Sequence, residues 1–299
     1  MLLCRARPQH LLARHRPCGS AAAASAPLRT LLDTLSPQHP DSPQPGHLRG
    51  HIDPTWMQGR TTYGGCSTAL CLSAAHDVLA AQQPLRSCHV SFIGPAGGDV
   101  TCEAEVVRTG RAMSFVRGDV RGADGKLATT ATFAFGASRE SNHDVTLSPP
   151  AYASHEGGIP SFVLPVDESE DFFGPLDADA RPRFTLNFEA RLAHGNRPGS
   201  GASSEKDPHA YDHWVYSRHK GGRDDGGVDG VDAVVSLLAL ADMPPPAMLA
   251  AATSFVPVSS VQWSVHFLET EDEGGLASMP GGWWLLRSRG EHLREGYVC

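Results

Sequence analysis

Asp242, Ser260 and Gln262 have the residue types and the spacing needed to form a polar site near the C-terminal end of the chain. Asp242 ends a nearly all-apolar run, and three prolines at 244–246 follow it. Ser260 and Gln262 share one face of an alternating segment. An aspartate that is ionised yet partly desolvated can accept a proton from water, and a hydroxyl beside it can orient that water. The pattern therefore indicates an acid and a hydroxyl that meet in an apolar wall.

Two elements must position these side chains. Residues 232–242 are almost entirely apolar, which predicts a helix buried on every side, and the prolines cannot continue it. Residues 261–267 alternate between apolar and polar types, which predicts a strand with one buried face. The structural alternative for Asp242 is an exposed carboxylate at a helix end. For Ser260 it is a hydroxyl bonded to backbone.

The first half of the chain predicts a similar combination of helix and strands. A helix of small apolar residues opens at Tyr63-Gly64-Gly65 and runs to about Gln82. Turn residues separate four predicted strands, at 85–93, 100–108, 113–120 and 127–135. One helix followed by an antiparallel meander is an α+β unit. Gly64 and Gly65 at the helix start would let backbone approach a pyrophosphate or a thioester, with close helix–sheet packing as the alternative.

An internal repeat relates the two halves. Residues 90–93 (Val-Ser-Phe-Ile) match residues 265–268 (Val-His-Phe-Leu), and each segment follows a long apolar helix. Residues 107–115 match residues 287–297 in the same way. Beyond this second match the first copy continues for 20 more residues, whereas the second copy ends two residues later, at Cys299. We therefore expect the last strand or two of the second copy to be missing.

The composition describes a soluble globular protein of one large or two ordinary domains. The chain has 299 residues, 40% of them hydrophobic and 19% charged, and no apolar run approaches the roughly 20 residues that span a bilayer. The formal net charge is -8, although five arginines and no acid precede Asp33. The acidic remainder argues against a nucleic-acid partner. Seven cysteines without a Cys-x-x-Cys pair indicate reduced thiols in an intracellular compartment.

Shifts in composition predict the domain organisation. Residues 1–28 are rich in Arg, Ala and Ser, which is typical of an organelle transit peptide and equally of a disordered tail. The predicted compartment is thus the mitochondrion or another organelle, otherwise the cytoplasm. The other predicted divisions are a first module at 29–138, a linker at 139–181, and a second module at 182–299. Within the second module we expect a strand at 184–192, a mobile insertion at 199–230 and a short strand at 213–217 inside that insertion.

The order of several motifs resembles the thioesterase-like superfamily related to bacterial acyl-CoA thioesterase II. In the first half the motifs are Asp53-Pro54-x-Trp56-x-Gln58-Gly59-Arg60, Tyr63-Gly64-Gly65, Val90-x-Phe92-Ile93-Gly94-Pro95 and Arg108-x-Gly110-Arg111. In the second half they are Leu240-Ala241-Asp242-x-x-Pro245-Pro246, Ser259-Ser260-Val261-x-Trp263 and Gly282-Trp283-Trp284-Leu285. The resemblance implies an α+β double hotdog, in which two long helices are each wrapped by an antiparallel sheet and fused in one chain.

The resemblance also implies a function, the hydrolysis of acyl-CoA thioesters to free acid and CoA, with no cofactor and no metal. In this family a helix aspartate, a Ser or Thr hydroxyl and a glutamine hold the attacking water. Asp242 falls on the aspartate and Ser260 on the hydroxyl. The glutamine belongs to the final strand of the second hotdog, which is missing here, and Gln262 is a different residue. Candidate substrate-binding residues are Gly64, Gly65 and Trp263, with a core position as the alternative for Trp263.

Three other functions remain as alternatives to thioester hydrolysis or are excluded by the sequence. A non-catalytic acyl-CoA or acyl-carrier binding protein is the main alternative, because the family's glutamine is absent. A hotdog dehydratase would need a histidine beside Asp242, and a serine hydrolase would need a Gly-x-Ser-x-Gly elbow; neither occurs. Four histidines with no common ligand spacing are predicted to be solvated, namely His194, His209, His213 and His219. A sheet without its closing strand would leave an open edge, which favours a homodimer.

Overall fold

The computed structural model describes the backbone of residues 2–3 and, in full, residues 25–79, 83–143, 159–174, 181–224, 226–254, 256–268, 276 and 278–299. Most of the predicted N-terminal tail and much of the predicted linker at 139–181 lie outside these residues. The predicted module boundaries therefore stay proposals.

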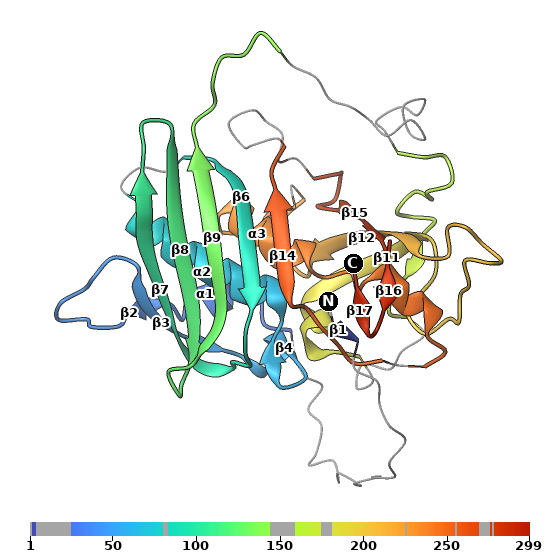
Figure 1. The fold of residues 1–299 in the computed structure, drawn as a ribbon, viewed down its shortest axis with the longest axis horizontal. Helices are drawn as coiled ribbons and strands as arrows, with labels where there is room; N and C mark the ends of the chain where they lie inside the picture. Colours follow the sequence, from blue (N-terminus) through green and yellow to red (C-terminus); the bar gives the residue numbers. More distant parts are fainter. Residues whose placement is uncertain are drawn as a thin grey trace, which may run out of the picture.

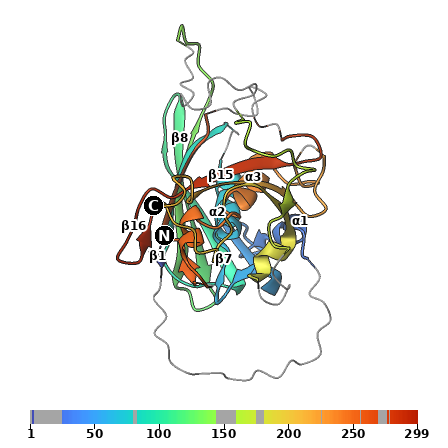
Figure 2. The same ribbon diagram turned by 90° about the vertical axis from the view of Figure 1, so that its right-hand side faces the viewer.

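The first half of the chain wraps one helix, α2 (Gly64–Val78), with long antiparallel strands (Figure 1). The sheet has the strand order β14-β6-β9-β8-β7-β3-β2. Its strands from this half are β2 (Ser36–Pro37), β3 (His47–Ile52), β6 (Leu85–Phe92), β7 (Gly98–Thr109), β8 (Met113–Gly122) and β9 (Leu127–Gly136). Figure 2 shows α2 and α3 on the same side of these strands. The predicted helix and four-stranded meander are confirmed, and the helix ends at Val78.

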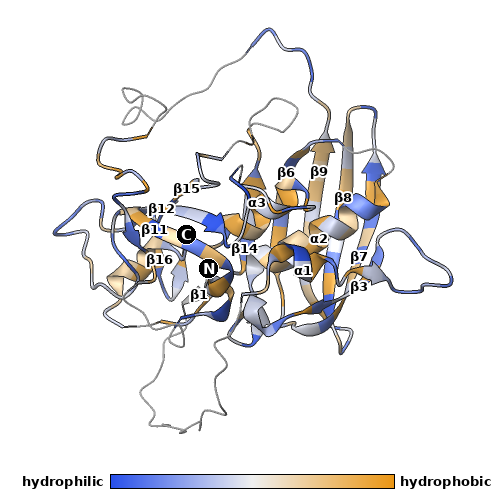
Figure 3. Cartoon of the chain, turned by 180° about the vertical axis from the view of Figure 1, so that it is seen from behind, coloured by the Kyte–Doolittle hydropathy of each residue, from blue (hydrophilic) through white to orange (hydrophobic). Residues whose placement is uncertain are grey.

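Small side chains on α2 let the sheet approach the helix closely. Cys66, Ala69 and Cys71 are fully buried. At Gly118 of β8, an added Cβ would lie 2.7 Å from the backbone carbonyl oxygen of Cys71. A larger side chain there would push the helix away from the sheet, because a packed interior does not absorb extra volume. Seen from behind in Figure 3, α2 crosses the strands with a mostly apolar surface.

The second half has its own helix and a smaller sheet. Helix α3 (Ala233–Ala241) begins at Asp232, whose carboxylate accepts hydrogen bonds from the N–H groups of Val234 and Val235. A carboxylate in this position caps a helix and interacts favourably with its dipole. The sheet has the order β10-β11-β12-β15. Its strands are β10 (Glu170–Asp171), β11 (Phe188–His194), β12 (Asp212–His219) and β15 (Trp284–Arg289).

One prediction for this half needs correction and another is confirmed. The strand predicted at 184–192 is a 3-10 helix, η3 (Arg183–Asn187), before it becomes β11. The 3-10 turn places Phe184 flat against Tyr63, with ring centroids 4.2 Å apart, and this tertiary contact overrides the alternating pattern. The short strand predicted at 213–217 is confirmed as β12 (Asp212–His219), which lies between β11 and β15, while the mobility predicted for the rest of 199–230 stays a prediction. Strand β12 is therefore an inner strand of the sheet.

Strand β14 (Gln262–His266) belongs to the first sheet although it comes from the second half. It pairs antiparallel with β6, from Gln262 opposite Ser91 to His266 opposite Ser87. These two strands are related by the internal repeat, so the two modules meet through corresponding elements. The edge of β6 is thus completed by its repeat counterpart, so the two modules of the double hotdog share one large sheet at this strand.

The same correspondence locates a gap. In the first half, β9 and β8 separate β6 from β7. In the second half, β14 corresponds to β6 and β15 corresponds to β7. Strand β14 pairs with β6 and β15 pairs with β12, and the described residues place no strand between β14 and β15. The predicted loss of closing strands from the second copy itself stays a prediction.

Short elements complete the fold. They are β1 (Leu2–Leu3), α1 (Leu28–Leu32), η1 (Pro54–Trp56), β4 (Met57–Gln58), β5 (Thr61–Thr62), η4 (Ala247–Ala251), β13 (Val258–Ser259), β16 (Leu293–Arg294) and β17 (Tyr297–Val298). One continuous apolar core contains the buried faces of α2, α3 and the large sheet. A second cluster, around Trp214, Tyr216 and Trp283, lies on the small sheet. Because α2 and α3 share the larger core, the two modules pack as one body.

Candidate active site

Asp242 joins the two helices at their ends. It is the C-terminal capping residue of α3, and its Oδ2 accepts a hydrogen bond of 3.0 Å from the backbone N–H of Gly65. The residue that caps α2 in sequence, Tyr63, makes no side-chain capping bond. The carboxylate of Asp242 thus supplies an acceptor at the N-terminus of α2 from 177 residues away. A negative charge is favourable there because the helix dipole is positive at this end.

Two glycines make this contact possible. A Cβ on Gly64 would lie 2.5 Å from Oδ2 of Asp242, and one on Gly65 would lie 2.7 Å from the carbonyl oxygen of Ala239. Both positions must therefore lack a side chain if α3 is to reach the start of α2. Gly64 and Gly65 were predicted to approach a substrate. Here they approach the candidate base, and neither lines the pocket described below.

Burial sets the charge state of Asp242. Desolvation raises the pKa of its carboxyl to about 7, and the hydrogen bond from Gly65 N–H acts in the opposite direction. The side chain is surrounded by protein but keeps partial access to the pocket beside it. A carboxyl group that titrates near neutral pH can act as a general base in its ionised form. This is the behaviour that the sequence predicts for a partly desolvated aspartate.

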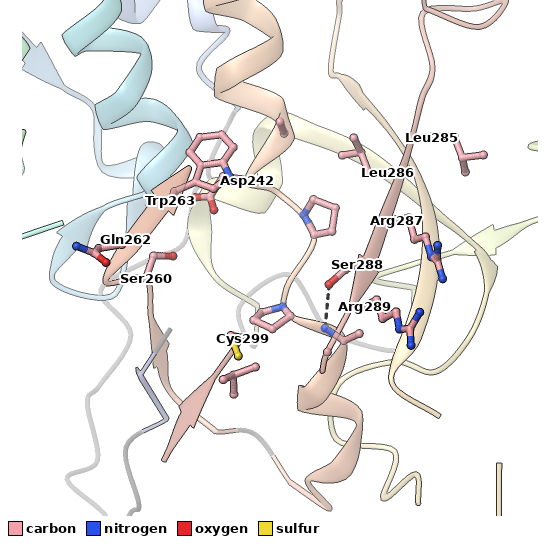
Figure 4. A pocket seen from close by; sticks show the side chains of 16 residues that line it. Asp242, Ser260, Gln262, Trp263, Leu285, Leu286, Arg287, Ser288, Arg289 and Cys299 are labelled. Carbon is pink, nitrogen blue, oxygen red and sulfur yellow. Dashed lines mark hydrogen bonds between the residues drawn. The ribbon is translucent and has the colours of Figure 1, made fainter. Parts of the chain in front are cut away.

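A pocket of ≈ 560 Å³ lies beside Asp242, bordered by β14 and β15. Ser260 lies just before β14 and points into the pocket, as does Asp242 (Figure 4). Trp263 lines the pocket on the same side and packs against the main core. Gln262 is exposed, and its amide points away from Asp242 (Figure 4). The predicted acid, hydroxyl and tryptophan therefore border one pocket, and Gln262 lines the same pocket with its amide turned away from Asp242.

The opposite wall comes from β15, where Leu286 and Ser288 lie on the side of Asp242 and the two arginines on the other (Figure 4). The guanidinium of Arg287 binds the carboxylate of Asp212 in β12 through two hydrogen bonds of 2.9 and 2.5 Å. Oγ of Ser288 accepts a 3.1 Å hydrogen bond from the N–H of Ala247 (Figure 4). Arg289 is exposed at the edge of the pocket. Sequence reasoning missed this wall because the ion pair joins strands 75 residues apart, and no local spacing signals such a contact.

Two of the four histidines predicted to be solvated are buried. His213 is 1% exposed and His219 is 4% exposed, both in β12. Burial lowers the pKa of each imidazole to about 4, so both are neutral at physiological pH. Nε2 of His219 lies 2.9 Å from the carbonyl oxygen of Ser236 in α3. Within the described residues, no group of three or more His, Cys, Asp and Glu side chains is arranged to hold a metal ion.

The raised pKa of Asp242 makes a prediction about stability. A carboxyl whose pKa is about 7 when folded and near 3.8 when unfolded binds its proton more tightly in the folded state. Its contribution to stability is therefore present below pH 4 and is lost as the pH rises to 7. We expect Asp242→Asn, which keeps an acceptor for Gly65, to raise the melting temperature at pH 8 and to have little effect at pH 4. Thermal unfolding of the wild type and the variant from pH 4 to pH 8 measures this effect. An equal change in melting temperature at both pH values would contradict the prediction.

Known proteins place this architecture in a class. A hotdog-fold protein from Alicyclobacillus acidocaldarius superposes with a TM-score of 0.66 at 22% identity, covering 90% of this chain and 88% of that one. An acyl-CoA thioesterase II from Mycobacterium marinum gives 0.56 at 15%, covering 91% and 88%. The TesB protein of Mycobacterium avium subspecies paratuberculosis gives 0.57 at 18%, covering 91% and 89%. The fold is thus that of the α+β double hotdog proteins.

The family follows from the sequence. Residues 52–136 match the model of the acyl-CoA thioesterase N-terminal domain, and residues 162–299 match that of the acyl-CoA thioesterase C-terminal domain. The chain belongs to the acyl-CoA thioesterase family. No curated protein is significantly similar to it in sequence. No helix among the described residues is both long and apolar enough to cross a membrane.

Proposed function

We propose that this protein hydrolyses acyl-CoA thioesters to the free acid and CoA, with Asp242 as the base that activates water and Ser260 as its partner. The observation that carries the proposal is the carboxyl of Asp242, which is buried at a helix N-terminus, titrates near pH 7 and borders a pocket. Family membership supplies the substrate class. Fatty acyl groups, and hence a role in lipid metabolism, are part of the proposal.

The proposed reaction needs three contributions from the protein. The ionised carboxylate of Asp242 takes a proton from water as that water attacks the thioester carbonyl, and it returns the proton to the CoA sulfur when the C–S bond breaks. The hydroxyl of Ser260 holds the water between the two groups. The positive end of α2 favours negative charge nearby, which helps to keep the carboxylate ionised despite its burial. Trp263 offers an apolar surface for the acyl chain, and Gly64 and Gly65 let the start of α2 approach the base.

The direct test is release of CoA from a panel of acyl-CoAs of increasing chain length, measured with a thiol reagent. We expect turnover of at least one member, with kcat/KM falling as the pH drops below about 7, because protonation removes the base. The absence of CoA release from every member would contradict the proposal.

Ser260→Ala tests the partner of the base. We expect kcat to fall by about tenfold, the effect of losing one neutral hydrogen bond, while KM changes little. Ser264→Ala is the matched control, because Ser264 lies on the exposed face of β14, where its Oγ is 2.9 Å from Nδ1 of His89. Equal rates for the two variants would remove Ser260 from the mechanism.

A second candidate is a non-catalytic acyl-CoA or acyl-carrier binding protein. The gap between β14 and β15 favours it, because strands fill the corresponding place in the first half and would complete the wall of the pocket. Tight binding of a non-hydrolysable acyl-CoA analogue by a protein that turns over none of the panel would support this function.

We also propose an organelle as the compartment, since the first 28 residues hold four arginines and no acid. A fluorescent reporter fused after residue 28 should then enter mitochondria or another organelle. A diffuse signal would favour the cytoplasm.

A further inference from the structure

Ser288 is a second hydroxyl of the pocket, on the wall opposite Ser260 (Figure 4). It lies in β15, where side chains alternate between the two faces, so that Leu286 and Ser288 face the pocket. Its Oγ accepts a 3.1 Å hydrogen bond from the backbone N–H of Ala247, the first residue of η4. A backbone group therefore fixes this half-buried hydroxyl at the wall of the pocket.

The bond from Ala247 leaves the proton of Ser288 available. A serine hydroxyl can donate one hydrogen bond and accept two. The N–H of Ala247 occupies one acceptor position, and the proton of Ser288 has no acceptor among the described residues. A hydroxyl that accepts from an amide is also a better donor, because bonds in a chain polarise one another. Ser288 thus offers a polarised donor to whatever enters the pocket.

Most other donors near the pocket are engaged or point elsewhere. The backbone N–H of Gly65, at the positive end of α2, already donates to Asp242. The guanidinium groups of Arg287 and Arg289 lie on the far side of β15 from Asp242 (Figure 4). The amide of Gln262 is turned away from Asp242 in the same view. None of these groups faces the carboxylate across the pocket.

The remaining side-chain donors differ from Ser288 in position or in strength. Ser260 and Trp263 lie on the wall of β14, beside Asp242, where the attacking water is proposed to be held. Cys299 also lines the pocket, but a thiol is a weak donor. Ser288 is therefore the hydroxyl that the pocket presents on the wall opposite the base.

We propose that Ser288 is a catalytic residue, whose hydroxyl donates to the carbonyl oxygen of the thioester. This assignment rests on the proposed hydrolysis assisted by Asp242. Water attacks the carbonyl carbon from a side away from the carbonyl oxygen, so this oxygen faces a wall other than the one that holds the water. As the new C–O bond forms, the π electrons of the carbonyl move onto its oxygen, and they return when the C–S bond breaks. A donor already in place stabilises that negative charge.

The kinetic test compares two variants of equal shape. Ser288→Thr keeps a hydroxyl, Ser288→Val replaces it with a methyl group, and both β-branched side chains suit a strand. We expect kcat for acyl-CoA hydrolysis to fall by about 10²–10³-fold in Ser288→Val, the effect of losing one donor to the oxyanion, while KM changes little. Ser288→Thr should keep most of the activity. Equal values of kcat in the two variants would overturn the assignment.

A spectroscopic readout separates this contact from the support that Ser288 gives to Ala247. Butanoyl-CoA and octanoyl-CoA, each labelled with ¹³C at the thioester carbonyl, are bound to Asp242→Asn, in which the proposed base is absent. A hydrogen bond to the carbonyl oxygen moves the carbon signal downfield from that of the free thioester. We expect this shift in Asp242→Asn and its loss in the double variant Asp242→Asn/Ser288→Val. A shift that persists in the double variant would refute the contact.

The two experiments distinguish failure of this assignment from failure of the proposed function. A shift that depends on Ser288, in a chain that releases no CoA, would support the contact and end the proposed hydrolysis. Turnover that is equal in Ser288→Thr and Ser288→Val would keep hydrolysis and remove Ser288 from it. A chain that binds neither labelled thioester and releases no CoA would refute both proposals.

Discussion

Asp242→Asn should lower kcat for acyl-CoA hydrolysis by about 10²–10⁴-fold, the range that a positioned general base contributes. The amide can still accept a hydrogen bond from the N–H of Gly65 at the start of α2, so the fold should be kept. It cannot take a proton from water, so the acid limb near pH 7 should vanish together with the activity. Steady-state kinetics from pH 5 to 9 would show both effects.

The matched control for this variant is Asp229→Asn. Asp229 also loses one negative charge, but its side chain is 88% exposed and its only recorded contact among the described residues is 3.8 Å from Arg223. Its kinetics should equal those of the wild type. Full activity in Asp242→Asn would leave the carboxylate with the structural role of capping α2 and would end the proposed mechanism.

Gly65→Ala should destabilise the protein by about 2–3 kcal/mol, the cost of overpacking a tight interior. Alanine is better than glycine inside a helix by about 1 kcal/mol, which opposes the effect. The new Cβ, however, would lie 2.7 Å from the backbone carbonyl oxygen of Ala239 and 2.8 Å from Oη of Tyr63. Backbone of a buried helix cannot move aside cheaply, so the clash should win. The midpoint of urea unfolding measures the change.

Gly122→Ala provides the comparison for the glycine variant. Its added Cβ would meet, at 3.3 Å, the carboxylate oxygen of Asp124, which sits on an exposed turn and can rotate away. We expect stability within about 0.5 kcal/mol of the wild type. Wild-type stability in Gly65→Ala would mean that α2 and α3 can separate at this point, and the hydrogen bond between Asp242 and Gly65 could then not be essential to the fold.

Much of this fold was predictable because its elements have clear periods. The small apolar residues of α2, the alternation of β6 to β9 and the apolar run of α3 each satisfy one simple pattern over many residues. The internal repeat relates the two modules in the sequence itself. Asp242 was found because a single acid ends an otherwise apolar helix, and Ser260 because it precedes an alternating segment.

The remaining features depend on contacts between distant residues, which the hydrophobic periodicity of a single element does not encode. A pattern shows which face of an element is buried but not which partner covers it. The hydrogen bond from Gly65 to Asp242 spans 177 residues, and nothing near either residue in sequence indicates the other. The turn at η3 arises from the stacking of Phe184 on Tyr63, a contact between the two modules. Alternation predicted the strand at 213–217 within Gly- and Ser-rich flanks, but it gave no sign that this strand, β12, lies between β11 and β15.

Strand β14, which closes the large sheet, has a consequence for how the chain folds. Its partner β6 was synthesised about 175 residues earlier, so the sheet of the first module is complete only after most of the second has been made. Pairing over such a separation carries a large loop-closure entropy and is slow. Until then β6 presents an unpaired edge to other nascent chains. The edge of β6 in the first module is therefore covered only once the second module has been synthesised. During translation, that edge is the surface that a chaperone would bind.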